Sequence, residues 1–379
     1  MNDFEHQIQS GEMKIVYIGR KMDDIVTGGE RRISEILRYL TEKNIEIKYL
    51  EPATKYHILN KENFILTNFC YMWEFLRIDR SCTQIIVEDY SKRFYLFIFN
   101  FFVWMIENVK LVCLVNAFYF SYRKSFIKNL IDRIVSILFL CPMDLIIAGG
   151  AAAKKELHHL KVSDSRIKVI EPALRPEFTK CKQYTKVRKD NSMINLLFVG
   201  RIHRVKGLEH LIKAVKILNM DNVRLHIVGN TTRVPQYTDE LVQLVAKERL
   251  YNNVVFLGEI KDVYKLIELY RNADIFILPS LWDTYPASLL EAMCFGLPIV
   301  ATNVGGISKL AIDAGALLIP PGNAEKLANA IKEVISGHPM MQKMREGSFK
   351  KSFEYRNRTW VDVGKEYYQI LSDLWRGKA

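Results

Sequence analysis

The sequence lacks the marks of several large protein classes. Its six cysteines form no Cys-x-x-Cys pair, so we expect buried thiols in a reducing compartment rather than a disulfide framework or a redox motif. There is no Asp-x-Asp, and no cluster of His, Cys and Asp has metal-ligand spacing, so no metal is predicted. No nucleic-acid-binding motif occurs, although the formal net charge is +12. A basic chain of this kind is expected to bind phosphorylated ligands or an anionic membrane surface.

Long hydrophobic runs are also missing. The first residues, Met-Asn-Asp-Phe-Glu-His-Gln, are polar and lack the apolar core of a signal peptide. The longest apolar run, residues 94–106, has 13 residues and contains Asn100, which is too short to span a bilayer. We therefore predict a cytoplasmic protein, either soluble or peripheral at the inner face of the membrane.

What the chain does contain is a regular alternation of apolar strands and amphipathic helices. Strands expected at 13–19 and 45–50 enclose a loop with Gly28-Gly29 and a helix over 30–43, which is the start of a βαβ unit. The same alternation resumes near residue 193. Such a pattern predicts mostly parallel sheets covered by helices.

The length and composition allow two such domains, because 379 residues with 49% hydrophobic content can form two cores. A proline-containing, basic stretch separates the two series of strands and reads as a linker. We predict an α/β protein with a first Rossmann-like domain over residues 1–182 and a second over 192–356. A C-terminal helix in 357–379 is expected to cross back to the first domain.

Residues 273–303 carry the strongest chemical pattern. An apolar strand over 274–278 is followed by a loop and a helix that Pro286 is expected to open. Asp283 lies just before that helix and Glu291 in its second turn, so both carboxylates are expected on one face. Helix N-termini bind anions, so this segment predicts a phosphate site beside carboxylates that can hold hydroxyl groups. The candidate ligand-binding residues at the start of the helix are Thr284, Tyr285, Ala287 and Ser288.

A second pattern lies at the end of the first strand of the second domain. Residues 199–207 read Val-Gly-Arg-Ile-His-Arg-Val-Lys-Gly, so Arg201 and Lys206 flank a tight turn and Gly207 opens a helix. A guanidinium group is a planar donor fork and an ammonium group a compact charge, and together they suit a diphosphate. A solvated basic turn is the alternative interpretation of this pattern by itself.

Together these patterns resemble the retaining glycosyltransferases of family 4, the group 1 family with the GT-B fold. Its members carry a Glu-x7-Glu pattern between a Pro-Ser strand end and a Glu-Ala-Met helix. They also carry Gly-Arg-x4-Lys-Gly at the head of the second domain. The resemblance is specific over residues 193–337 and mostly architectural over 13–180. It implies two Rossmann-like domains with a donor cleft between them.

The resemblance also implies a function. A sugar would move, with retention and without a metal or cofactor, from a UDP- or GDP-sugar to a hydroxyl of a glycan or lipid-linked acceptor. The product would belong to polysaccharide, glycolipid or cell-surface glycan synthesis. Arg201 and Lys206 would neutralise the leaving diphosphate, Asp283 would hold sugar hydroxyls, and Glu291 would hold the ribose. Loops that would contact the donor, mainly through backbone, include Gly28, Gly29, Gly229 and Ile260.

Some positions depart from the family pattern. The first acid is Asp283 rather than Glu, and its side chain is one methylene shorter. Ser308-Lys309 replaces the Pro-Glu that usually follows the Gly305-Gly306 pair. The His that members commonly place after a middle strand of the first domain is missing, because residues 116–118 read Asn-Ala-Phe. Candidates for the acceptor side are Asn116, Glu88 and Asp89.

Alternatives of other classes stay open at this stage. A non-catalytic GT-B scaffold or membrane-associated partner subunit would share the fold, as would a GT-B sugar-nucleotide epimerase. The charged residues at both motifs favour transfer. In addition, residues 94–126 contain 12 aromatic residues among basic ones. These rings either fill the core of the first domain or seat the protein on a membrane interface.

Overall fold

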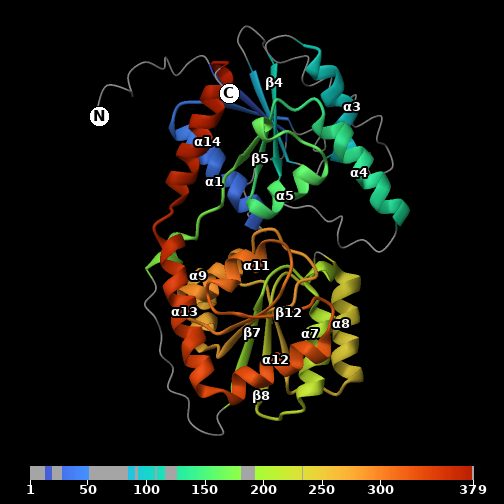
Figure 1. Cartoon of the computed structure of the whole chain (residues 1–379), viewed down its shortest axis with the longest axis vertical. Coiled ribbons are helices and arrows are strands. Elements are labelled where there is room, and N and C mark those ends of the chain that lie inside the picture. Colours follow the sequence, from blue (N-terminus) through green and yellow to red (C-terminus); the bar gives the residue numbers. More distant parts are fainter. Residues whose placement is uncertain are drawn as a thin grey trace. The chain divides into compact units, whose positions relative to one another are not determined.

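The structure is a computed structural model of the whole chain, which divides into two compact units (Figure 1). The first unit comprises residues 1–172 together with 360–379, and the second comprises 173–359. The residues that the structure describes are 13–18, 28–50, 84–89, 93–106, 109–115, 126–180, 193–232 and 234–377.

Six parallel strands form the sheet of the first unit. Their order across the sheet is β2 (Glu46–Leu50), β1 (Lys14–Ile18), β3 (Gln84–Asp89), β4 (Val109–Val115), β5 (Leu145–Ala148) and β6 (Ile167–Val169). The strands at the centre are buried on both faces, which is why their sequences are continuous apolar runs rather than alternating ones. These strands confirm the expected alternation in the first half of the chain.

Helices cover both faces of this sheet (Figure 1). They are α1 (Gly28–Glu42), α3 (Arg93–Trp104), α4 (Phe126–Leu140), α5 (Ala151–His159), the short η4 (Asp164–Arg166) and α14 (Trp360–Trp375). Helices α1 and α14 lie side by side on one face, while α3 and α4 pack together on the other. The helix expected from residue 30 begins two residues earlier, at Gly28.

The last helix, α14, is tied to α1 by close packing and by a buried arginine. A Cβ atom on Gly364 would lie 2.3 Å from Cγ of Tyr39, so only glycine lets the two helices approach this closely. The Arg32 guanidinium donates to Ile170 O and to Tyr367 Oη, each at 2.7 Å. The chain therefore returns to the first unit after completing the second.

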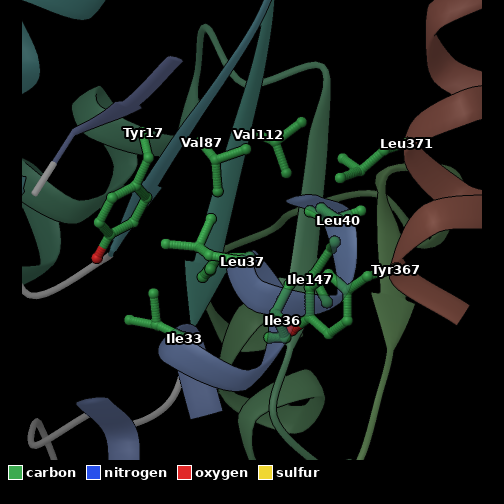
Figure 2. Close-up of a pocket in the computed structure, with 11 residues that line it drawn as sticks. Tyr17, Ile33, Ile36, Leu37, Leu40, Val87, Val112, Ile147, Tyr367 and Leu371 are labelled. Atoms are coloured by element: carbon green, nitrogen blue, oxygen red, sulfur yellow. The ribbon is translucent and has the colours of Figure 1, made fainter. Parts of the chain in front are cut away.

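An apolar cavity lies between α1, α14 and the sheet (Figure 2). It is lined by side chains such as Leu37, Val112 and Leu371, with the ring of Tyr367 at one side. Its volume is about 10 Å³, close to the minimum that admits a single water molecule. We interpret it as a packing void of the core rather than a ligand site.

The second unit has a six-stranded parallel sheet of its own. The order is β12 (Leu317–Ile319), β11 (Ile299–Thr302), β10 (Ile275–Leu278), β7 (Ile194–Val199), β8 (Val223–Val228) and β9 (Val254–Gly258). Counted from β7 as the first strand, this is the 3-2-1-4-5-6 order of a dinucleotide-binding fold. The order reverses between β7 and β10, and ligands of such sheets bind outside the carboxyl ends of the strands at that point.

The helices of the second unit follow the strands as the sequence predicts. They are α6 (Pro176–Thr179), the short η5 (Arg204–Lys206), α7 (Leu208–Leu218), α8 (Pro235–Lys247), α9 (Val263–Asn272), α10 (Ala287–Cys294), α11 (Gly305–Ile312), α12 (Ala324–Ser336) and α13 (His338–Arg356). Two Rossmann-like α/β units are therefore confirmed.

The domain boundaries differ in one respect from those expected. Residues 173–180, which were expected at the end of the first domain, belong to the second unit. The reason is Phe178, which is fully buried in the core of the second unit beside Tyr270 and Phe295. Most of the expected linker, and the helix expected near residues 64–78, lie outside the described residues. Within the described part of the chain, no helix combines the length and apolar composition needed to cross a bilayer.

Candidate functional site

Two loops meet where the strand order of the second sheet reverses. Residues 200–207 follow β7, and residues 279–286 follow β10. The backbone N–H of Leu281 donates to Val205 O at 2.7 Å, which joins the two loops. A Cβ on Gly207 would lie 2.3 Å from Pro279 O, and its φ of +64° is in the left-handed region. Glycine is thus required at this position both by backbone conformation and by the close approach.

Lys206 and Asp283, both predicted site residues, form an ion pair between these loops. The Lys206 Nζ group donates to Asp283 Oδ2, and the two side chains are only 11% and 12% exposed. The Arg201 side chain, from the same turn as Lys206, is exposed. The structure therefore places a largely buried ion pair and an exposed guanidinium group at the carboxyl ends of the central strands.

The backbone of Gly305-Gly306 packs directly against the backbone of the loop that contains Asp283. The N–H of Gly306 donates to Asp283 O at 2.8 Å. A Cβ on Gly306 would lie 1.8 Å from Thr284 O, and one on Gly305 would lie 2.0 Å from Asp283 O. The loop therefore contacts the first residues of α11 directly. A side chain larger than hydrogen at either glycine would prevent this contact. The pair therefore has a conformational role in positioning the Asp283 loop.

The two acidic residues of the central motif do not share a helix face, contrary to the sequence-based expectation. Helix α10 begins at Ala287 with Pro286 as its N-cap residue, so Asp283 lies in the loop before it. The periodicity argument requires both residues to be helical, and only Glu291 is. Each carboxylate instead has its own cation.

Glu291 is buried and accepts hydrogen bonds on both carboxylate oxygens. Arg175 donates from Nε and Nη2 to Oε1, at 3.0 and 2.7 Å, and Tyr270 Oη donates to Oε2 at 2.8 Å. The Arg175 guanidinium also stacks on the Phe178 ring, 4.5 Å from its centroid. Burial and the Glu291 carboxylate raise the pKa of Tyr270, which stays a hydrogen-bond donor. Glu291 thus anchors the segment that leads into the second unit.

Arg175 and Tyr270 were missed by the sequence analysis. Arg175 lies in the proline-containing stretch that reads as a linker, and Tyr270 occupies an apolar position of an amphipathic helix. Neither lies in a motif, and their partner Glu291 is 116 and 21 residues away in the chain. Tertiary packing brings them together: α6 packs on α10, and the Tyr270 side chain reaches Glu291 from α9.

Three buried polar atoms of the β10–α10 loop have no hydrogen-bond partner in the structure. They are Ser280 Oγ, Trp282 Nε1 and Thr284 Oγ1. Buried polar atoms are normally satisfied by protein, water or ligand. The loop that carries Asp283 therefore contains two hydroxyl groups and an indole N–H that no protein group satisfies.

The other predicted residues lie at strand and helix ends. Gly229 follows β8 and supports the neighbouring loop, since a Cβ there would lie 2.1 Å from Gly200 O. Ile260, after β9, and Tyr285 are half-buried against the core. Ala287 is exposed and Ser288 half-buried at the start of α10. In the first unit, Gly28 and Gly29 open α1, while Asn116 and the side chains of Glu88 and Asp89 lie outside the described part.

His203 gives the basic turn a pH-dependent stability. Its Nδ1 accepts a hydrogen bond from the N–H of Val205 at 3.1 Å, which requires an unprotonated Nδ1. Burial, then the charges of Arg201, Lys206 and Arg204, lower the pKa of His203 below its usual value of 6.5. The unfolded chain therefore binds this proton at a higher pH than the folded one. The contribution of neutral His203 to the free energy of unfolding is complete above about pH 6.5. It is lost as the pH falls toward and through the folded-state pKa.

We expect the Tm of the wild type to fall more steeply between about pH 7.5 and 5.5 than that of His203→Asn. The asparagine amide oxygen can still accept from Val205 but does not titrate. His338→Asn, which replaces an exposed histidine of the second unit, serves as the control and should keep the slope that the wild type has. Equal slopes for wild type and His203→Asn would contradict this assignment.

Comparison with known proteins agrees with the geometry. Residues 182–351 match the family model described as glycosyl transferases group 1. The match covers 170 of the 379 residues of the chain. The group 1 region thus contains both loops, the Lys206–Asp283 pair and Glu291, whereas Arg175 lies just before it.

Curated relatives match part of the chain. An uncharacterized glycosyltransferase of Methanocaldococcus jannaschii is 31% identical over 194 residues, which are 50% of this chain and 47% of the relative. A D-inositol 3-phosphate glycosyltransferase of Pseudarthrobacter chlorophenolicus is 31% identical over 174 residues, 44% of this chain and 40% of the relative. The chain therefore spans about half the length of the curated relatives that it matches.

Solved structures resemble almost the whole chain. Sucrose-phosphate synthase from Thermosynechococcus elongatus covers 97% of this chain and 100% of its own, with a TM-score of 0.78 at 17% identity. The Anabaena protein HepE, in complex with UDP and glucose, covers 95% of this chain and 100% of its own, with a TM-score of 0.71 at 18% identity. These likenesses, with the two parallel six-stranded sheets, show that the group 1 glycosyltransferase region belongs to a GT-B fold.

Proposed function

We propose that this protein is a retaining, metal-independent glycosyltransferase that uses a nucleoside diphosphate sugar as donor. The observation that carries the proposal is the Lys206–Asp283 pair at the point where the strand order of the second sheet reverses. Together they can bind both parts of such a donor. The Lys206 ammonium group attracts the diphosphate, and the Asp283 carboxylate accepts hydrogen bonds from sugar hydroxyls.

The cations stabilise the charge that develops on the leaving group. As the bond between the anomeric carbon and the diphosphate oxygen breaks, its electron pair stays on the diphosphate. Lys206, whose side chain is 11% exposed, and Arg201, as a planar donor fork, would neutralise this charge. Electrostatic stabilisation of this kind is usually the largest single contribution to a rate enhancement.

The acceptor supplies the nucleophile. Its hydroxyl oxygen bonds to the anomeric carbon on the face that the leaving group vacates, and the hydroxyl proton passes to a phosphate oxygen of the departing diphosphate. Configuration is then retained, and no nucleophilic side chain is needed. Asp283, oriented by Lys206 and by the Gly306 N–H under its backbone, holds the sugar during this exchange.

Glu291 has room for one further hydrogen bond. A carboxylate offers about four acceptor sites, and Arg175 and Tyr270 together use three of them. We therefore assign to Glu291 one ribose hydroxyl of the donor at most, on the Oε2 side. Its main work is to fix α6 and α9 against α10.

The comparisons support a UDP-sugar as the first donor to test. The Anabaena HepE structures were determined with UDP, with UDP and glucose, and with UDP-glucose. The curated relatives include D-inositol 3-phosphate glycosyltransferases. The acceptor is proposed only as a hydroxyl of a glycan or of a lipid-linked glycan.

The test is donor binding and turnover with a panel of UDP- and GDP-sugars in the presence of EDTA. Binding to the folded state should raise Tm, and release of the nucleoside diphosphate should follow. Lys206→Ala and Asp283→Asn are each expected to lower turnover about 100-fold or more. Lys213→Ala, which removes an exposed lysine of α7, should leave turnover unchanged.

Two results would overturn the proposal. If no nucleotide or nucleotide sugar raises Tm, the scaffold alternative is favoured. If turnover requires a divalent cation, the metal-independent mechanism is wrong.

A further inference from the structure

Helices α3 and α4 present a continuous apolar surface to the outside of the first unit. On α3 the exposed residues are Phe101, Phe102 and Trp104, and Met105 follows directly after the helix. On α4 they are Ile127, Leu130, Ile131, Ile134, Ile137 and Leu138. Their exposed fractions range from 47% to 68%. The two helices pack side by side (Figure 1), so these residues form one surface, which we call the α3–α4 face.

Helix α4 has the reverse of the polarity expected for a surface helix. It buries Asp132 and Ser136, at 1% and 0% exposure, and turns aliphatic side chains outward. Ser136 Oγ donates to Asp132 O within the helix. The core of the unit needs only residues such as Phe139 from this helix. The outer aliphatic stripe is therefore not required by the fold, and large contiguous apolar patches on soluble proteins mark interaction sites.

The composition of the α3–α4 face favours a lipid surface over a protein partner. Among the exposed residues of α3 and α4 whose side chains the structure describes, Arg133 is the one charged residue. A protein interface usually contains about one hydrogen bond per 100–200 Å², for which this face has almost no donors or acceptors. A bilayer interior needs none. Trp104, whose ring lies 6.3 Å from that of Phe101, is a residue type enriched at membrane interfaces, and phenylalanine is common on the apolar face of interfacial helices.

The composition of the sequence segment that contains α3 and α4 also argues against a second copy of this chain as the occupant. Between residues 92 and 133 the acidic residues are Glu107 and Asp132. The basic residues there are Lys92, Arg93, Lys110, Arg123, Lys124, Lys128 and Arg133. A two-fold symmetric dimer would bring this positive segment against itself. An anionic lipid surface complements it, as it does the net charge of +12 of the whole chain.

We propose that the α3–α4 face docks the protein on an anionic lipid bilayer. Helix α4 lies along the surface, with the six aliphatic side chains in the upper acyl region and Arg133 among the headgroups. The residues Ile127 to Leu138 extend about 16 Å along the helix at 1.5 Å per residue, which suits a helix lying in the interface plane. The inference does not depend on the proposed transfer reaction.

The test is co-sedimentation of the full chain with phosphatidylcholine vesicles that contain or lack phosphatidylglycerol. We expect the wild type to bind the anionic vesicles, and less so at high salt. The variant Ile131→Ser/Ile134→Ser/Leu138→Ser should bind about tenfold or more weakly, because each replacement removes several buried methylene groups. Arg133→Glu should weaken binding to anionic vesicles and leave binding to neutral ones unchanged.

The matched control is Tyr264→Ser/Ile312→Ser. These two residues, on α9 and α11 of the second unit, are 71% and 61% exposed, so the control removes similar exposed apolar area elsewhere. It should bind as the wild type does, and circular dichroism should show that all variants are folded. Equal vesicle binding by the triple variant and the wild type would overturn the proposal. So would absence of vesicle binding, or a wild-type dimer that the triple variant dissociates.

Discussion

Replacing Glu291 with alanine is expected to lower the free energy of unfolding by about 3–5 kcal/mol, measured by chemical denaturation. The side chains of Arg175 and Glu291 are only 16% and 8% exposed, so removal of the carboxylate leaves a shielded guanidinium group without its anion. The hydroxyl of the fully buried Tyr270 loses its acceptor at the same time. Glu291→Gln, which keeps an acceptor oxygen, should cost less.

The control for this variant is Glu240→Ala. Glu240 also accepts from an arginine, Arg204, but the two side chains are 49% and 52% exposed. Exposed pairs contribute about 0–1 kcal/mol, so the control should hardly change the midpoint of unfolding. If both variants unfold alike, the Arg175–Glu291 pair is not a structural anchor. Loss of transfer in Glu291→Ala should be attributed to donor contacts only at temperatures where the variant is folded.

Gly306→Ala is expected to abolish transfer and to destabilise the second unit by about 3 kcal/mol or more. The new methyl group would lie 1.8 Å from the carbonyl oxygen of Thr284. That oxygen belongs to the backbone, so the loop itself must move away from α11. Such a shift displaces Asp283 from Lys206 and breaks the hydrogen bond from the Gly306 N–H to Asp283 O. Turnover, donor binding and Tm should all fall.

Gly258→Ala separates the steric effect from a general cost of replacing glycine. Gly258 has a φ of +68°, yet a Cβ there would meet nothing within 4 Å. We expect a loss of about 1 kcal/mol from the left-handed backbone and near-normal turnover. A Gly306→Ala variant as active as Gly258→Ala would show that the loop tolerates displacement, and that the position of Asp283 matters less than proposed.

The strands and their sequence in the chain could be predicted because each is a short apolar run ended by glycine, proline or a polar residue. The strand expected over 13–19 is found at Lys14–Ile18, and that over 45–50 at Glu46–Leu50. The motif residues Lys206 and Asp283 were also singled out by the sequence. Their mutual contact was not, because it depends on β10 lying next to β7 rather than next to β9.

The environment of Glu291 could not be predicted for a different reason. The eight-residue spacing from Asp283 suggests a shared helix face, but Pro286 caps the helix after Asp283, and periodicity does not extend into a loop. The partner Arg175 comes from a stretch whose composition is that of a linker. This stretch belongs to the second unit because Phe178 packs against Tyr270. The two residues are far apart in the chain, so the local sequence does not predict their contact.

The position of β7 in the second sheet has a consequence for synthesis of the chain. One side of β7 pairs with β8, the next strand in the chain, but the other side pairs with β10. Strand β10 emerges from the ribosome only after α7, β8, α8, β9 and α9. At usual synthesis rates the interval between Val199 and Ile275 lasts about 4–15 s. During that time the central strand of the finished sheet is an edge strand with fully apolar residues such as Leu196 and Phe198. The nascent protein is therefore most exposed to aggregation through the strand that later holds its charged site, and a chaperone that shields β7 would act in this interval.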